Sequence, residues 1–121
     1  MRLEIRTDEG RVNFLPGEDV CFHLGWSGVP EGSTGRARLV WWIEGSGDAD
    51  HHTVAEHLQR GLLPAGELKW EVDIPSTPYS YRGKAFSIRW GVEFEVAAGG
   101  DLERLDLVIG PGGVAVGPEV D

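Results

Sequence analysis

The sequence predicts an all-β protein, an antiparallel β-sandwich of about seven to eight strands. Apolar and polar residues alternate with a period of two along several segments, which is typical of strands with one buried and one exposed face. Turns that contain Gly and Pro separate these segments at short intervals. The chain has 121 residues, 18 of them Gly and 7 Pro, and this length fits a single domain. A barrel is the alternative way to close such strands.

The clearest alternation runs through residues 84–96. The even-numbered residues, which include Trp90 and Phe94, are mostly apolar and are predicted to face the core, whereas the odd-numbered residues, which include Glu93 and Glu95, are predicted to face solvent. Gly91 lies near the middle of this strand and is a candidate for a bulge or bend. The region 48–61 has weak helical character, but its poor apolar stripe favours a strand at 53–59 or irregular structure. The other predicted strands cover residues 2–6, 11–15, 19–26, 36–43, 67–74 and 104–109.

We expect residues 1–110 to form the sandwich and residues 111–121 to form a flexible tail rich in Gly and Pro. An edge strand at residues 114–116 is the alternative for part of that tail. Four tryptophans fall on the apolar parity of their strands and are predicted to fill the core: Trp26, Trp41, Trp70 and Trp90.

The net charge of the chain limits the classes of ligand that it is expected to bind. Acidic side chains outnumber basic ones 20 to 11, and the net charge of -9 argues against binding to nucleic acid or to an anionic membrane surface. The N-terminus has no apolar run of signal-peptide length, and no segment reaches the length of a membrane span. The lone Cys21 allows no disulfide within the chain, and we expect it to fill the core rather than act as a nucleophile. These observations predict a cytoplasmic protein.

Two motifs resemble those of the arrestin-like fold family. Residues 15–20, Leu-Pro-Gly-Glu-Asp-Val, resemble the turn between the first strands of that family. Residues 73–84 resemble its second motif, in which a strand end is followed by a Pro-Tyr-Ser segment, an aromatic residue and a glycine before a long strand. The two motifs follow the order of the family and lie within residues 11–96. The resemblance implies an immunoglobulin-like sandwich that acts as a non-enzymatic adaptor or scaffold in protein–protein interactions.

Two departures from the family limit what the resemblance implies. Its members usually carry two such sandwiches in tandem, whereas this chain has room for one. Arrestins that read phosphorylated receptor tails use clustered basic residues, and no Lys/Arg cluster in this acidic chain matches them. Phosphate reading is therefore not expected.

Trp42 is the strongest candidate for contact with a partner. If Trp41 points into the core, Trp42 points outward beside Val40, and an exposed tryptophan is a typical binding anchor. The alternative is that Trp42 packs under a loop or the tail. Tyr81 is a second exposed candidate. We therefore predict binding to another protein or self-association as a homodimer, through this face or through paired edge strands. A carbohydrate-binding sandwich that stacks its ligand on Trp42 and Tyr81 is the alternative function.

A histidine-rich segment, residues 48–57, is the remaining candidate for chemistry. It contains His51, His52 and His57 with three carboxylates, all of which are potential ligands for a divalent metal. Its spacing matches neither the zinc-protease helix nor a structural zinc site, so a polar surface hairpin is the alternative. On a regular strand, His51 and His57 would share one face. The sequence has no nucleophile elbow and no phosphate-binding loop, so we expect neither enzyme activity nor a cofactor.

Overall fold

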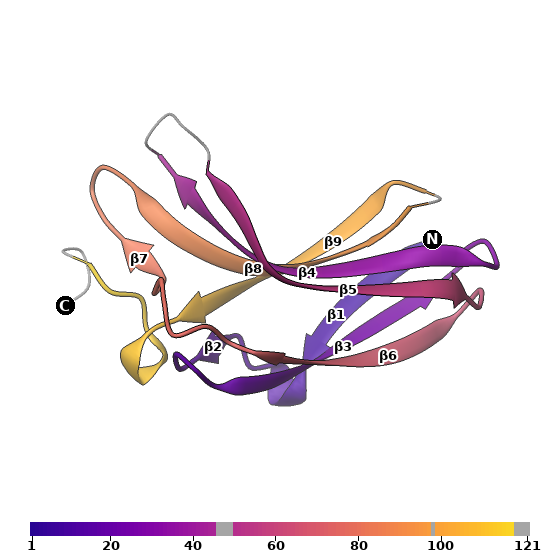
Figure 1. Cartoon of the computed structure of the whole chain (residues 1–121), viewed down its shortest axis with the longest axis horizontal. Helices are drawn as coiled ribbons and strands as arrows, with labels where there is room; N and C mark the ends of the chain where they lie inside the picture. The colour runs from indigo at the N-terminus through magenta and orange to yellow at the C-terminus, as the bar shows by residue number, and fades with distance from the viewer. Residues whose placement is uncertain (46–49, 98, 118–121) are drawn as a thin grey trace.

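The computed structural model describes residues 1–45, 50–97 and 99–117. Within these ranges the chain forms two β-sheets that pack face to face, so the predicted all-β sandwich is confirmed (Figure 1). Short 3₁₀ turns, η1 (Asp8–Gly10) and η2 (Pro111–Gly113), follow the first and last strands. The strands are β1 (Arg2–Thr7), β2 (Asn13–Phe14), β3 (Asp19–Ser27), β4 (Ser33–Glu44), β5 (His51–Leu62), β6 (Gly66–Asp73), β7 (Tyr81–Arg82), β8 (Ser87–Val96) and β9 (Asp101–Ile109).

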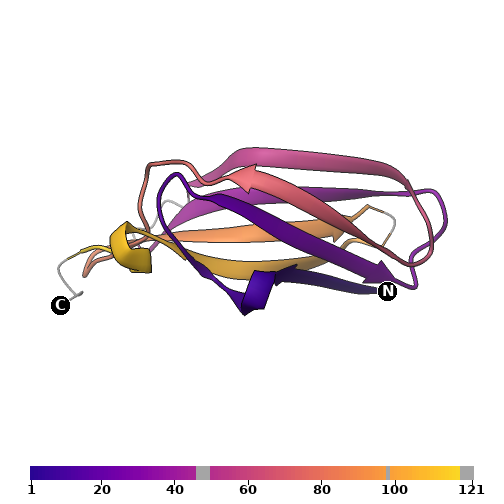
Figure 2. The ribbon, with the colours of Figure 1, turned by 90° about the horizontal axis from the view of Figure 1, so that it is seen from below.

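The smaller sheet has the strand order β1-β3-β6, and it lies nearest the viewer in Figure 2. The larger sheet has the order β2-β9-β8-β4-β5, with β7 paired to β8. The strands pair antiparallel except for β2, which runs parallel to β9. Across the sandwich, β1 contacts β9 along one long side and β6 contacts β5 along the other. Each side of the sandwich is therefore formed by two strands from different sheets.

The core lies between the sheets and consists of the apolar side chains that occupy alternate positions of the strands. All four tryptophans predicted for the core contribute to it. Trp70 and Trp90 are buried, whereas Trp26 and Trp41 are partly buried and pack against the same cluster. The indole N–H of Trp90 donates to the Pro78 carbonyl at 3.1 Å, which satisfies its only polar atom.

β5 occupies the region of mixed helical and strand signals, and its pairing with β4 shifts register twice, between Ser33 and Gly35 and between Leu39 and Val40. The second shift is a bulge in β5. In its pairing with β4, Thr53 lies opposite Val40 and Ala55 lies opposite Leu39, so Val54 is an extra residue. One extra residue exchanges the two faces of a strand. The side chains on either side of Val54 therefore do not follow a single regular alternation.

Gly91 causes no bulge, so that part of the prediction is wrong, whereas a bend there stays a prediction. The pairing of β8 with β4 and with β9 passes through Gly91 without a shift of register. A Cβ at this position would lie 3.3 Å from Cζ3 of Trp42 and 3.3 Å from the carbonyl oxygen of Leu105. The glycine instead leaves room for the Trp42 ring on the outer face of the larger sheet.

The segment that follows β9 lies against β7. Val116 forms an isolated parallel bridge with Tyr81. The N–H of Arg82 donates to the Val116 carbonyl at 2.8 Å, and the N–H of Val116 donates to the Ser80 carbonyl at 2.9 Å. These bonds correspond to the alternative of an edge contact at residues 114–116. The predicted flexibility of the segment stays a prediction, and residues 118–121 lie outside the described part of the chain.

Candidate functional site

Trp42 lies in β4 on the outer face of the larger sheet, over Gly91. The guanidinium carbon of Arg104 is 4.7 Å from the centroid of its ring. The imidazole of His51 stacks on it with centroids 6.3 Å apart and an interplanar angle of 20°. The indole N–H donates to Oε2 of Glu44 at 3.4 Å. These contacts hold the partly buried indole in one orientation and leave part of it open to solvent.

A group of charged side chains lies on the same face. Nη2 of Arg38 is 3.2 Å from Oε1 of Glu95 and 3.6 Å from Oε1 of Glu93. Nε2 of His51 is 4.0 Å from Oε2 of Glu93, which connects this group to the stacking partner of Trp42. Glu93 is only 8% exposed, so its expected place on a fully solvated face is wrong. The nearby Arg38 offsets the cost of burying that carboxylate.

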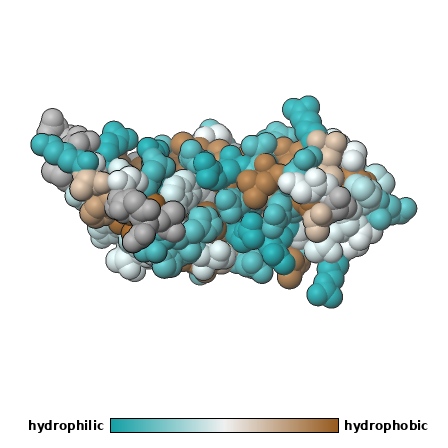
Figure 3. Space-filling model, turned by 90° about the horizontal axis from the view of Figure 1, so that it is seen from above, coloured by the Kyte–Doolittle hydropathy of each residue, from teal (hydrophilic) through white to brown (hydrophobic). Residues whose placement is uncertain are grey.

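The outer face as a whole is hydrophilic with small hydrophobic areas. Figure 3 views the molecule from above, the side on which the larger sheet lies in Figure 1, and no single hydrophobic area spreads across it. The side chains that contact the partly exposed ring of Trp42 are those of Arg104, His51 and Glu44. The ring therefore lies among polar groups, as many binding anchors do.

Val40 does not belong to an open surface, which corrects the prediction that it flanks Trp42 there. Its exposed fraction is 0%. Alternation of side chains does place Val40 on the same face as Trp42, but β4 is an inner strand between β5 and β8. On that face its neighbours along the strand are the long side chains of Arg38 and Trp42. Alternation predicts the face of a residue and not how deeply it is covered.

Tyr81 lies on the opposite face of the sheet from Trp42. It pairs with Ile88, which pairs with Ile43, and residues opposite each other in a ladder point to the same face. Ile43 directly follows Trp42 in β4 and so points the other way. Tyr81 stacks on Phe86 with ring centroids 5.1 Å apart. The structure therefore does not bring Trp42 and Tyr81 together into one stacking platform.

The three histidines of the predicted metal segment do not meet. His51 lies beside Trp42 on the outer face, while His52 stacks on Trp41 with centroids 4.1 Å apart. His57 lies further along β5, near Trp70 of the smaller sheet. The bulge at position 54 puts His52 and His57 on one face, not His51 and His57. Within the described ranges, no three His, Cys, Asp or Glu side chains lie close enough to hold a metal ion.

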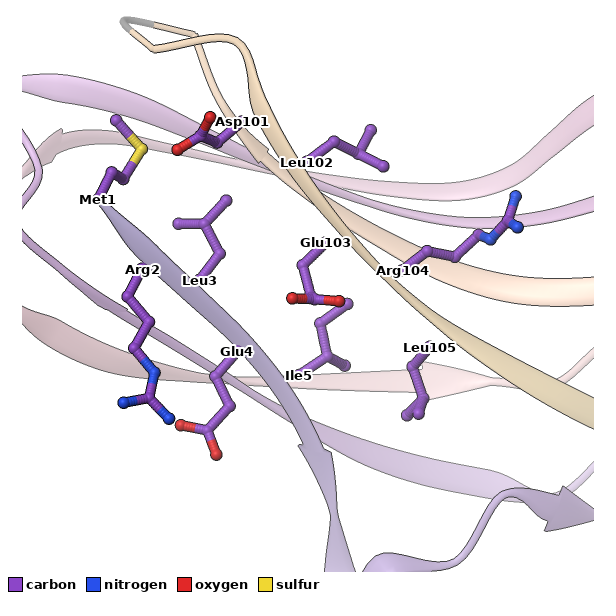
Figure 4. A pocket seen from close by; sticks show the side chains of 10 residues that line it. All are labelled: Met1, Arg2, Leu3, Glu4, Ile5, Asp101, Leu102, Glu103, Arg104 and Leu105. Atoms are coloured by element: carbon purple, nitrogen blue, oxygen red, sulfur yellow. The ribbon is translucent and has the colours of Figure 1, made fainter.

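A groove of about 530 Å³ between β1 and β9 was not predicted. Leu3 and Ile5 of β1 and Leu105 of β9 line it, and the side chains of Asp101 and Glu103 extend into it (Figure 4). Asp101 and Glu103 lie two and four positions before Leu105, so they share its face of the strand, and this is the one feature of the sequence that points to the groove. That signal is insufficient because only the order of strands in the two sheets shows that β9 faces β1.

Two carboxyl groups near the β2–β3 turn have shifted pKa values. Hydrogen bonds from the Arg11 guanidinium, one of them 2.6 Å long, lower the pKa of Glu18. Asp19 lies opposite Asp73 in the β3–β6 pair, and hydrogen bonding and repulsion between the two carboxyls raise the pKa of Asp19. Both shifts arise from local contacts at strand ends.

Cys21 is partly buried on the outer face of the smaller sheet, so its predicted place in the core is wrong. Its neighbours Val20 and Phe22 face the core, and alternation turns Cys21 away from it. Burial, together with the negative charge of Asp8, raises the pKa of the thiol.

Comparison with solved structures supports the fold. Spo0M, a sporulation control protein from Bacillus subtilis, matches with a TM-score of 0.62 and 12% sequence identity, over 91% of this chain and 49% of the Spo0M chain. The two proteins share a fold. This is the arrestin-like sandwich that the sequence motifs predict, and at this identity the likeness extends to the fold alone. The present chain spans about half the length of Spo0M.

Other comparisons carry less weight. The alkylpurine DNA glycosylase AlkC from Pseudomonas fluorescens, bound to DNA containing an abasic site analog, matches with 16% identity over 90% of this chain and 30% of its own. Its TM-score of 0.35 is too low to support an argument about fold or function. No family model and no curated protein matches the chain. Within the described residues, no helix has the length and apolar character needed to cross a bilayer.

Proposed function

We propose that this chain is a non-enzymatic protein-interaction module whose contact surface is the outer face of the larger sheet around Trp42. The position of the indole carries the proposal: it is partly exposed, and Arg104 and His51 hold it in place. A side chain that is already ordered loses little conformational entropy on binding. Tryptophan and arginine are also the residue types most enriched among residues that dominate binding energy.

The partner is another protein rather than nucleic acid or an anionic membrane. The net charge of -9 supports this choice, since those ligands attract proteins through clustered lysine and arginine. The shared fold with Spo0M, which is described as a sporulation control protein, agrees with a regulatory role in place of catalysis. We place this role in the cytoplasm, where a lone thiol such as Cys21 stays reduced.

The proposal is tested by affinity purification of the tagged chain from its native cell. Trp42→Ala should remove a partner that wild-type protein retains. Tyr79→Ala is the matched control because Tyr79 is an aromatic residue, 37% exposed, that lies between β6 and β7 and is not among the contacts of Trp42 described above. A partner set that is unchanged by Trp42→Ala would contradict the proposal, as would one lost equally in both variants.

A further inference from the structure

β5 forms a free edge of the larger sheet. It is 12 residues long, and among the described residues β4 is the only strand paired with it. Unpaired N–H and C=O groups along an edge are a template for another strand, and proteins commonly protect such edges with charged side chains. β5 carries Glu56 and Arg60 as its only Asp, Glu, Lys or Arg residues, while Val54 and Leu58 are each 41% exposed.

The two edges of the smaller sheet are better protected. In β1 and β6, a charged residue occupies every second position, on the face away from the core. These residues are Arg2, Glu4 and Arg6 in β1 and Glu67, Lys69, Glu71 and Asp73 in β6. β5 is therefore the long edge with the lowest density of charge.

Two hydrogen bonds of β4 show which way the backbone of β5 points. The N–H of Ala97 donates to the Thr34 carbonyl at 3.2 Å, so even-numbered residues of β4 direct their backbone groups toward β8. The N–H of Ile43 donates to the Asp50 carbonyl at 3.0 Å, so odd-numbered residues direct theirs toward β5. This alternation holds along β4 because its pairing with β8 has no shift of register.

The free backbone groups of β5 belong to alternate residues. Positions 35, 37 and 39 of β4 lie opposite positions 59, 57 and 55 of β5, which therefore bond to β4. Glu56 and Leu58 alternate with them, so their N–H and C=O groups point to the open edge. Arg60 continues this alternation up to a second register shift, which lies between the Gly35–Gln59 and Ser33–Leu62 pairs beside Gly61, whose φ is 69°. A strand added at this edge would bond to these three residues.

Charge selects one way for β5 to pair with itself. With a two-fold axis at Leu58, the two Leu58 side chains lie opposite each other, and each Glu56 lies opposite Arg60 of the second copy. An axis at Glu56 or at Arg60 instead places like charges opposite each other, and an axis at position 57 or 59 places a charged residue opposite Leu58. Opposite charges across a ladder stabilise pairing and like charges weaken it.

We propose that a second copy of this chain pairs antiparallel with β5 about a two-fold axis at Leu58. The larger sheets of both copies then join into one continuous sheet, with about six new backbone hydrogen bonds, two for each of the three facing pairs. This inference goes beyond the proposed function, because it uses the β5 edge and leaves the Trp42 surface free for another protein.

Sedimentation equilibrium of the full chain and of charge-exchanged variants tests the inference. Wild-type protein should form a dimer. Glu56→Arg and Arg60→Glu should each weaken it by about ten-fold or more, because each places two pairs of like charges opposite one another. An equimolar mixture of the two variants should restore a dimer, because every facing pair is then opposite in charge. Glu71→Arg, the same change on the β6 edge, is the control and should dimerise as wild type does.

Several results would overturn the inference. One is a wild-type chain that stays monomeric up to about 1 mM. Another is a folded Glu56→Arg variant that dimerises as tightly as wild type, or a mixture of the two variants that stays monomeric. A dimer lost in Trp42→Ala and kept in Glu56→Arg would also overturn it while leaving the proposed Trp42 surface intact. Because the exchanged side chains are exposed, circular dichroism should show that each variant folds, and Leu58→Lys provides a second way to block the edge.

Discussion

Trp42→Ala should leave the protein folded and lower its free energy of unfolding only moderately. A fully buried large apolar side chain contributes about 1.5–3 kcal/mol, so a partly buried indole contributes about half of that. Its cation–π contact with Arg104, 4.7 Å from the ring centroid, adds about 0.5–1 kcal/mol at an exposed site. The expected loss is therefore about 1.3–2.5 kcal/mol, against about 3–5 kcal/mol for truncating a core tryptophan such as Trp90.

Urea denaturation followed by far-ultraviolet circular dichroism measures this loss, with Trp90→Ala as the comparison. A double-mutant cycle with Arg104→Met isolates the contact between cation and ring, and the coupling should be about 0.5–1 kcal/mol. If Trp42→Ala destabilised the protein as much as Trp90→Ala does, the indole would be a core residue. The reasoning that assigns it to binding would then be refuted.

Three further predictions concern other parts of the sandwich. Ser80→Ala should lower the free energy of unfolding by about 1–3 kcal/mol, because the buried Ser80 hydroxyl accepts the Ile109 N–H at 2.9 Å; unchanged stability in urea would contradict this. Asp73→Asn should raise the melting temperature at neutral pH. The raised pKa of Asp19 means that its ionisation costs stability there, so the gain should vanish as the pH falls through that pKa, and a gain independent of pH would argue against the pair. Cys21 should be alkylated more slowly at neutral pH than a free peptide thiol, and faster as the pH rises; mass spectrometry that found equal rates would show that its pKa is not raised.

The strands of this fold are readable from the sequence because one face of most of them is buried. Alternation correctly places Trp70 and Trp90 in the core, since a single step along a strand reverses a side chain. The same rule fails at Val40, because it says nothing of how much the neighbouring strands cover. It fails for the histidines because Val54 is an extra residue in β5, and nothing in the local sequence marks it.

Features that depend on the order of strands in the sheets could not be predicted from the sequence. The groove between β1 and β9 requires residues about a hundred positions apart to face each other, and only sheet topology specifies that. Trp42 was identified correctly as an outward-facing residue of β4. Its packing over Gly91 and its contact with Arg104, however, depend on the pairing of three strands. The sequence therefore predicts one residue of the candidate surface, Trp42, but not the residues of other strands that surround it.

Photo-crosslinking in the native cell tests most directly whether the outer face of the larger sheet binds a protein. A photoreactive residue replaces Arg89, the exposed neighbour of Trp42 across the β4–β8 pair, and in a second variant replaces Lys69 on the outer face of the smaller sheet. We expect a discrete cross-linked protein from position 89, its loss when Trp42→Ala is added, and no such product from position 69. A product from position 69 alone, or one from position 89 that survives Trp42→Ala, would contradict the assignment of this surface.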